Sequence, residues 1–245
     1  MSRFKKIVGA ILALWAIIMF VTTMLLFIIP IWLTGLFKEP QKTELFIKIS
    51  RIWMAVFLPL TGIIMKIKGK EKFIAGQNYI VVCNHSSFMD VPVSSPGIPG
   101  PNKTIAKIEM SRIPLFGMIY KRGSVLVDRK NEKSRKDSIN KMKEILEMGI
   151  HMCIYPEVTR NRSGKPLKEF HDGAFKLAVQ TGKPIMPAII LNTSKVLSPK
   201  NVFQFWPHPI SMHFLDPIFV NQTDDPQILK ERVFQIMWEY IKTHQ

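Results

Sequence analysis

The sequence predicts an α/β protein in which helices cover a mostly parallel mixed sheet, preceded by a hydrophobic helical membrane anchor. An uncharged stretch lies near the amino terminus, and short apolar runs alternate with helical stretches after residue 65. Strands that alternate with helices are typical of a parallel sheet with helices on its faces. The 245 residues suffice for one sizeable domain and an anchor. We therefore expect an anchor over 1–65 and a second domain over 66–245.

The anchor is predicted from hydropathy. No charged residue occurs between Ile7 and Phe37, and roughly 20 apolar residues are enough to cross a bilayer. Pro30 is expected to kink or end this helix. A second apolar stretch, Ile52–Met65, is short for a span and suits an interfacial segment or the return arm of a helical hairpin. A buried core helix is the alternative, which an uncharged run of this length disfavours.

Basic residues flank the uncharged stretch on both sides. One cluster precedes it and a second follows it: Arg3, Lys5 and Lys6, then Lys38, Lys42, Lys48 and Arg51. Because positive charge favours the cytoplasmic side, a hairpin with both ends in the cytoplasm satisfies both clusters. We expect the protein at the cell membrane with its second domain on the cytoplasmic face. Whether the anchor spans the bilayer or enters one leaflet stays open.

The net charge alone favours no particular partner, because an anionic-lipid surface, a nucleic-acid surface and a plain solvated surface can all be basic. The formal net charge is +16, and most of the excess lies in residues 66–245. Beside an anchor, a basic surface favours the anionic headgroups of membrane lipid. Nucleic acid is not expected, because no strand interleaves basic and aromatic residues.

Cys83 and Cys153 form no CxxC pair and are expected to be small buried side chains.

The second domain begins with an alternation of strands and helices. Strands are expected at Tyr79–Cys83, Ser124–Val127, Met152–Tyr155 and Ile185–Leu191, and further strands at Val202–Phe205 and Ser211–Phe214. Helices are expected at Ser134–Met148, at Gly173–Thr181 and from Asp225-Pro226 to near the end. In sheets of this kind ligands bind beyond the carboxyl ends of the strands. The reactive residues should therefore follow the strands directly.

A histidine and an aspartate follow the first predicted strand of the second domain. His85 comes just after Tyr79–Cys83, and Asp90 lies five residues further on. The serines between them can cap a short helix that turns Asp90 back toward His85. A carboxylate bonded to one imidazole nitrogen fixes the tautomer and leaves the other nitrogen free to take a proton. From the spacing alone, a histidine that only caps a loop is an equally supported alternative.

Arginines follow two later strands. Arg129 lies two residues past Ser124–Val127, and Pro-Glu-Val-Thr-Arg at 156–160 follows Met152–Tyr155. Arginine forks match phosphate oxygens bidentately. A base beside such arginines suits a phosphorylated alcohol, although either arginine in isolation is expected to form a surface ion pair. The chain has no Gly-x-Ser-x-Gly elbow and no His-Glu-x-x-His metal motif.

Four short blocks in order resemble the glycerolipid acyltransferases, most closely the 1-acylglycerol-3-phosphate acyltransferases. They are Asn-His-x4-Asp at 84–90, Gly-Ser-Val-Leu-Val-Asp-Arg at 123–129, Pro-Glu-Val-Thr-Arg at 156–160 and Ile-Met-Pro-Ala-Ile at 185–189. Each block alone is weak evidence, whereas four in order are strong. The resemblance covers about residues 60–220, and a hydrophobic amino-terminal hairpin is also typical of that family.

The resemblance implies a reaction and a set of roles. His85 would deprotonate the sn-2 hydroxyl of lysophosphatidic acid, which attacks an acyl thioester, and Asp90 would orient His85. The acceptor pocket would hold Lys107, Arg129, Glu157, Thr159 and Arg160. The co-substrate would be acyl-CoA or an acyl carrier protein. No other cofactor, no metal and no covalent acyl-enzyme are expected.

Val158 departs from the family pattern, which has glycine in Glu-Gly-Thr-Arg. Glycine usually marks a positive φ or a close backbone approach. Either this loop has an ordinary backbone here, or Val158 strains it and crowds the phosphate pocket. We expect weakened acceptor binding or activity with the fold intact.

Two other functions stay open at this point. One is the same transfer to another lyso-lipid acceptor. The other is a non-catalytic basic module that binds anionic lipid or membrane, for which His85 would be dispensable.

Overall fold

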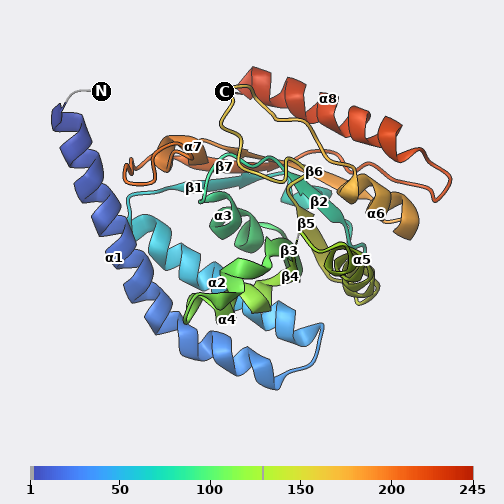
Figure 1. The fold of residues 1–245 in the computed structure, drawn as a ribbon, viewed down its shortest axis with the longest axis horizontal. Helices are drawn as coiled ribbons and strands as arrows, with labels where there is room; N and C mark the ends of the chain where they lie inside the picture. The colour runs from blue at the N-terminus through green and yellow to red at the C-terminus, as the bar shows by residue number, and fades with distance from the viewer. Residues whose placement is uncertain (1–2, 129, 245) are drawn as a thin grey trace.

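The computed structural model describes residues 3–128 and 130–244, and within these it forms one seven-stranded sheet flanked by helices (Figure 1). The strand order is β1-β7-β6-β2-β5-β3-β4. Their bounds are β1 Met65–Lys68, β2 Ile80–Cys83, β3 Asn102–Lys107, β4 Ser124–Val127, β5 His151–Ile154, β6 Ile185–Leu191 and β7 Ile210–Phe214.

The helices differ widely in length. The longest are α1 Arg3–Leu33, α2 Gln41–Leu60, α8 Pro226–His244 and α5 Glu132–Glu147; the shorter ones are α3 Asp90–Gly97, α4 Phe116–Gly123, α6 Gly173–Thr181 and α7 Thr193–Val196. Three 3-10 turns, η1 Thr34–Leu36, η2 Lys70–Lys72 and η3 Ile108–Arg112, complete the described elements.

The sheet is mostly parallel, as predicted. Strands β6, β2, β5, β3 and β4 run in one direction, whereas β7 is antiparallel to β6 and carries β1 parallel to itself. Central strand β2 pairs Val81 with Cys153 on one side and with Met186 on the other. The carboxyl ends of five strands therefore meet at one edge of the sheet, and the candidate site lies there.

Strand β2 supplies both layers of the core. Val81 and Cys83 pack in the cluster that includes α1, α2 and α3, while Ile80 and Val82 pack in the cluster that includes α5, α6 and α8. All four residues are fully buried. Such continuous burial is the property of parallel strands that are covered on both faces, and it explains why β2, β5 and β6 are uninterrupted apolar runs.

Two strands were missed and one predicted strand is wrong. Strand β3 has no apolar run, but its polar side chains find partners: Asn102 Nδ2 donates to Ser95 O at 2.8 Å, and Lys103 Nζ lies 2.8 Å from Glu39 Oε1. Strand β1 alternates apolar and lysine residues and was also not predicted. Residues 202–205 form no strand, because this segment lies against α1, where the Phe205 N–H donates to Gly9 O at 3.1 Å.

Helices α1 and α2 form an antiparallel hairpin along one side of the sheet (Figure 1). Trp15 Nε1 donates to Leu60 O at 2.9 Å, and Trp53 Nε1 donates to Thr23 Oγ1 at 2.9 Å. Pro30 does not end α1, which continues to Leu33. The return arm is longer than predicted, because α2 begins at Gln41 and includes the charged residues that precede Ile52.

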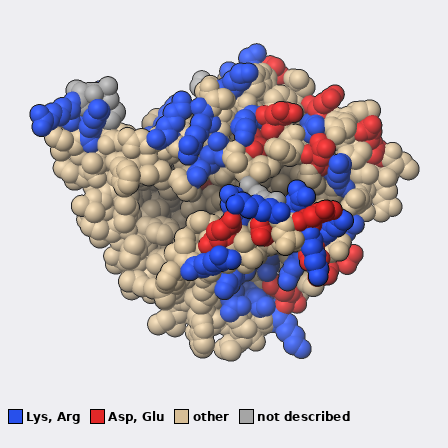
Figure 2. Space-filling view, viewed as in Figure 1, with Lys and Arg blue, Asp and Glu red and all other residues tan. Residues whose placement is uncertain are grey.

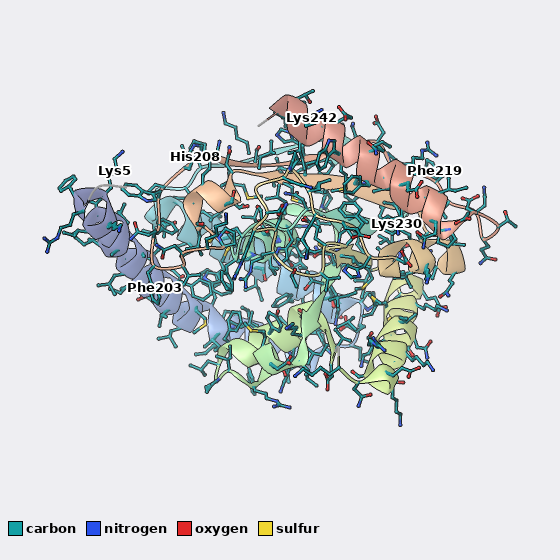
Figure 3. The ribbon with its side chains drawn as sticks, turned by 45° about the horizontal axis from the view of Figure 1, so that its top comes forward. Lys5, Phe203, His208, Phe219, Lys230 and Lys242 are labelled. Carbon is teal, nitrogen blue, oxygen red and sulfur yellow. The ribbon has the colours of Figure 1, made fainter. Side chains whose placement is uncertain are left out.

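The hairpin leaves a large apolar surface exposed. Arg3–Leu36 is the one described helical segment long and apolar enough to cross a membrane, with a mean hydropathy of 2.7 and 22% of its most apolar window buried. Figure 2 shows this side of the molecule without charge except near the amino-terminal end of α1. Lys5 and Phe203 lie toward that same end of the molecule (Figure 3).

Candidate active site

His85 and Asp90 meet at the carboxyl end of β2, as the sequence predicts. The Nδ1 atom of His85 lies 2.8 Å from Asp90 Oδ2. Asp90 is fully buried as the first residue of α3, whereas 18% of the His85 side chain is exposed. The imidazole therefore has one nitrogen held by a buried carboxylate and one edge open to a substrate.

The Asp90 carboxylate is held by donors from two strand ends. Oδ2 accepts the backbone N–H groups of Ser86 and Ser87 at 2.6 and 2.8 Å, and Oδ1 accepts the Thr193 hydroxyl at 2.6 Å. Both carboxyl oxygens of Asp90 therefore act as hydrogen-bond acceptors. With Asp90 Oδ2 as the acceptor, Nδ1 is the donor atom of His85, and an imidazole that carries its proton on Nδ1 has its lone pair on Nε2.

Asn84 fixes the strand end that carries His85. Its Nδ2 donates to Ile190 O at 2.9 Å and its Oδ1 accepts the Ile190 N–H at 2.7 Å. This two-point bond joins the end of β2 to β6 beyond the regular ladder. It also aligns β6 so that Thr193, two residues past that strand, reaches Asp90.

Glu157 ties the His85 loop to the segment after β5. Its Oε1 accepts the His85 N–H at 2.7 Å and its Oε2 accepts the Lys168 N–H at 2.8 Å. The residue is fully buried, and burial raises the pKa of its carboxyl group to about 7, against the lowering effect of the two backbone N–H groups. Glu157 thus acts here as a buried acceptor that positions two loops.

Val158 has a φ of 61°, which resolves the question raised by the sequence. This is the left-handed region that favours glycine, and a β-branched residue is an outlier there. The Val158 N–H donates to Tyr155 O at 3.0 Å, so a tight turn imposes the conformation. The loop therefore keeps the backbone of a glycine-containing turn and holds a valine under strain.

Thr159 and Arg160 follow in the same loop. Thr159 Oγ1 accepts from Lys168 Nζ at 2.6 Å. The guanidinium carbon of Arg160 lies 3.2 Å from the centroid of the Phe88 ring, a cation–π contact with the loop that carries His85. Burial lowers the pKa of Arg160. The stacked guanidinium places a cation beside the histidine loop, where an anionic substrate group would be attracted.

The other two predicted basic residues are not joined to this cluster in the described structure. Lys107 is exposed at the end of β3, with β5 between that strand and β2, and no hydrogen bond or ion pair links it to the described site residues. Arg129 lies outside the described residues. Strands β2, β3, β5 and β6 end at the same edge of the sheet. Close contact between site residues is shown only for those that follow β2, β5 and β6.

Tyr155 lies beneath the histidine. Its ring centroid is 4.5 Å from that of His85, and its hydroxyl is 2.6 Å from Ser94 Oγ on α3. Burial raises the pKa of the Tyr155 hydroxyl well above its ordinary value, so this hydroxyl stays protonated. The sequence analysis missed Tyr155 and Thr193 as site residues. Tyr155 was predicted as the last residue of a strand, whereas it directly follows β5, and Thr193 lies two residues past β6, so an extended strand-end rule could have found both.

Comparisons with known proteins show the family of the chain. The model of the family described as Acyltransferase matches residues 64–191, which is more than half of the chain and includes His85, Asp90, Glu157 and Arg160. The chain belongs to the Acyltransferase family. The matched segment also includes Lys107, Arg129 and Thr159, so every site residue predicted from the sequence falls inside it.

Curated relatives are about 30% identical to the chain over the segments that align. A 1-acyl-sn-glycerol-3-phosphate acyltransferase of Cocos nucifera is 32% identical over 68% of this chain, and the alpha form of Homo sapiens is 31% identical over 76%. The Escherichia coli protein of the same name is 28% identical over 69%. The matches span 55% of the coconut protein and 66% of the human protein, less than two thirds of each.

A solved structure shares the whole fold. The 1-acyl-sn-glycerophosphate acyltransferase PlsC of Thermotoga maritima superposes with a TM-score of 0.81 over 98% of this chain and 97% of that chain. Its sequence is 20% identical, so this likeness shows the fold. The correspondence extends beyond the family segment to the amino-terminal hairpin and the carboxyl-terminal helix.

Proposed function

We propose that this acyltransferase transfers a fatty acyl group from an acyl thioester to the sn-2 hydroxyl of 1-acylglycerol-3-phosphate, giving phosphatidic acid. The 2.8 Å contact between His85 Nδ1 and Asp90 Oδ2 carries the proposal, because it leaves Nε2 as a proton acceptor at a substrate-accessible edge. The names of the curated relatives support the acceptor.

The proposed reaction is one displacement at the acyl carbon. The acceptor hydroxyl lies against His85 Nε2, which takes its proton as the oxygen attacks the thioester carbonyl. The C–O bond forms and the C–S bond breaks, and the sulfur leaves as a thiol with the proton from the imidazolium. Asp90 stabilises that imidazolium without giving up its own bonds to Ser86, Ser87 and Thr193.

The acceptor's phosphate is assigned to the cations beside His85. Arg160 is held beside the His85 loop by its stack on Phe88. Lys107 is the last residue of β3 and Arg129 comes two residues after β4 in the sequence, and both would complete the phosphate site. Thr159 and Glu157 shape the loop that presents Arg160. The reaction needs no metal and no cofactor other than the acyl donor.

The exposed hairpin supports a location at the membrane. Two points along α1 contact the second domain: the Phe205 N–H donates to Gly9 O near the start of the helix, and Phe20 in its middle packs on Phe116 of α4, with 6.3 Å between ring centroids. A helix held along its length by the domain favours insertion into one leaflet over a full span. We propose that the domain lies on the cytoplasmic face of the cell membrane, where acyl-CoA and acyl carrier protein are found.

An acyl-transfer assay tests the proposal. Purified protein in detergent or in phosphatidylcholine vesicles receives labelled acyl-CoA or acyl carrier protein, together with lysophosphatidate or another lyso-lipid. We expect labelled phosphatidate as the main product, and a fall of about 10²–10⁴-fold in kcat for His85→Ala, the range of a general base. Preference for a neutral lyso-acceptor would replace the acceptor assignment, and transfer by His85→Ala at the parent rate would refute the mechanism.

A further inference from the structure

A cavity of about 460 Å³ lies on the side of α4 and η3, and none of its lining residues belongs to the candidate active site. Three cations line it: Arg112, Lys121 and Arg122. Two exposed apolar residues, Ile113 and Leu115, line it as well. No acidic residue lines the cavity, so its electrostatic potential is positive.

The three cations have no anionic partner in the part of the chain that the structure describes. No described carboxylate lies within 4.0 Å of Arg112, Lys121 or Arg122. The Nε atom of Arg122 is buried and has no hydrogen-bond partner among the described residues. A buried guanidinium N–H without an acceptor is costly, and a bound anion would satisfy it.

The position of Arg122 links the cavity to the hairpin. Its guanidinium lies directly against Gly35 in the turn after α1, where any side chain at Gly35 would clash with it. Leu36, the next residue, is 75% exposed. On the opposite arm, Phe46 of α2 packs on Gly123 at the end of α4. The cations therefore border the exposed apolar surface of the hairpin.

The apolar residues of the cavity continue that surface. Ile113 and Leu115 are 44% and 53% exposed, and Leu115 has a φ of 60°, which a leucine rarely adopts. Figure 2 shows basic side chains along the border of the uncharged side of the molecule. An apolar layer beside clustered cations matches the order of acyl chains and phosphates in a bilayer leaflet.

We propose that this cavity binds the phosphate group of an anionic membrane phospholipid whose acyl chains lie against the hairpin. Arginine forks match two phosphate oxygens at once, and Lys121 adds a third cation. The lipid phosphate would lie against the guanidinium group of Arg122, which lines the cavity and has no anionic partner among the described residues. The proposal concerns lipid selectivity at a site apart from the catalytic pair, so it does not depend on turnover.

Vesicle co-sedimentation tests the proposal in the full-length His85→Ala protein, which removes turnover from the measurement. Binding is measured to phosphatidylcholine vesicles with and without a minority of phosphatidylglycerol. The exposed pair is changed together, Arg112→Gln with Lys121→Gln, because exposed substitutions spare the fold. We expect about a tenfold loss of affinity for the anionic vesicles and unchanged binding to phosphatidylcholine alone.

A charge-matched control separates a site from general attraction. Lys133→Gln with Arg135→Gln removes one lysine and one arginine that are exposed on α5. We expect this control to retain nearly all of its affinity for anionic vesicles. Equal losses in the control and the cavity variant would overturn the proposal, because they would show general surface attraction.

A competition experiment distinguishes binding of a lipid phosphate group from binding of inorganic phosphate. Inorganic phosphate is added to anionic vesicles at constant ionic strength set with sodium chloride. We expect no displacement, because a bound lipid is also held by its acyl chains. Displacement that requires Arg112 and Lys121 would identify a site for soluble phosphate and overturn the bilayer assignment. Arg122→Gln, with thermal unfolding as the folding control, should lose selectivity as the exposed pair does.

Discussion

Glu157 Oε1 accepts the backbone N–H of His85 at 2.7 Å, so the loop that carries the proposed base is held from the neighbouring strand end. The other oxygen of the same carboxylate accepts Lys168 N–H at 2.8 Å. One buried carboxylate therefore joins three segments: the loop after β2, the turn after β5 and the segment before α6. Its charge state should affect both stability and the position of His85.

Glu157 predicts a pH-dependent stability. The pKa of its carboxyl group is about 7 in the folded protein and 4.5 for an unperturbed glutamate, so folding takes up a proton between these pH values. The contribution of Glu157 to the free energy of unfolding is fully present below its unfolded pKa and is lost as pH rises through its folded pKa. Its magnitude is about 3 kcal/mol. Glu157→Gln should remove this pH dependence from the free energy of unfolding.

Urea unfolding at about pH 5 and about pH 8 checks this prediction. The glutamine turns an NH2 group toward one of the two backbone N–H groups that Glu157 accepts, so the variant should be less stable at the higher pH, where Glu157 is a carboxylate with two acceptor oxygens, by about 1–3 kcal/mol. An unchanged pH dependence in the variant would assign the titration to another group.

Thr193→Val should lower activity by weakening the support of Asp90. The substitution keeps the shape and removes the hydroxyl that donates to Asp90 Oδ1 at 2.6 Å. We expect kcat to fall about tenfold, equivalent to the loss of one hydrogen bond to a charged group, with KM little changed. Steady-state kinetics provides the measurement, and Thr193→Ser should restore most of kcat. A rise in KM alone would place Thr193 in substrate binding instead.

Val158→Gly should relieve the strain at φ 61°. A non-glycine residue in this region costs about 1–2 kcal/mol, and the added chain entropy of glycine offsets about 0.5–1 kcal/mol, so a small net gain in stability is expected. We also expect a lower apparent KM for the acceptor, because the valine side chain no longer crowds the loop. Val158→Ala, which keeps a Cβ, should recover less of either effect. An unchanged KM for the acceptor in the glycine variant would show that the Val158 side chain does not hinder acceptor binding.

Tyr155→Phe should affect stability more than activity. It removes the hydroxyl bonded to Ser94 Oγ at 2.6 Å and keeps the ring that lies 4.5 Å from His85. Ser94 is then left buried without this partner, which costs about 1–2 kcal/mol. A double-mutant cycle with Ser94→Ala isolates the pair, and the two substitutions should cost less together than their sum. Tyr155→Leu, which removes the ring, should in addition lower kcat.

The sequence by itself predicted the class of fold and the contact between His85 and Asp90. Apolar runs predicted β2, β5 and β6, because parallel strands covered on both faces are mostly apolar, and the run at Ser124–Val127 predicted the edge strand β4. The residues that directly follow β2 and β5 were predicted to meet because those strands run parallel. The uncharged run predicted the exposed apolar helix α1.

Only the tertiary structure decided which residues support that pair. Thr193 lies 103 positions from Asp90, and no local pattern reports a contact between two strand ends. Strand β3 is mostly polar and is stabilised by partners from other segments, so its hydropathy pattern did not predict a strand. The sequence left two backbones possible at Val158, and the bond from its N–H to Tyr155 O selected the strained one. Local hydropathy determined the elements, whereas long-range hydrogen bonds determined the site.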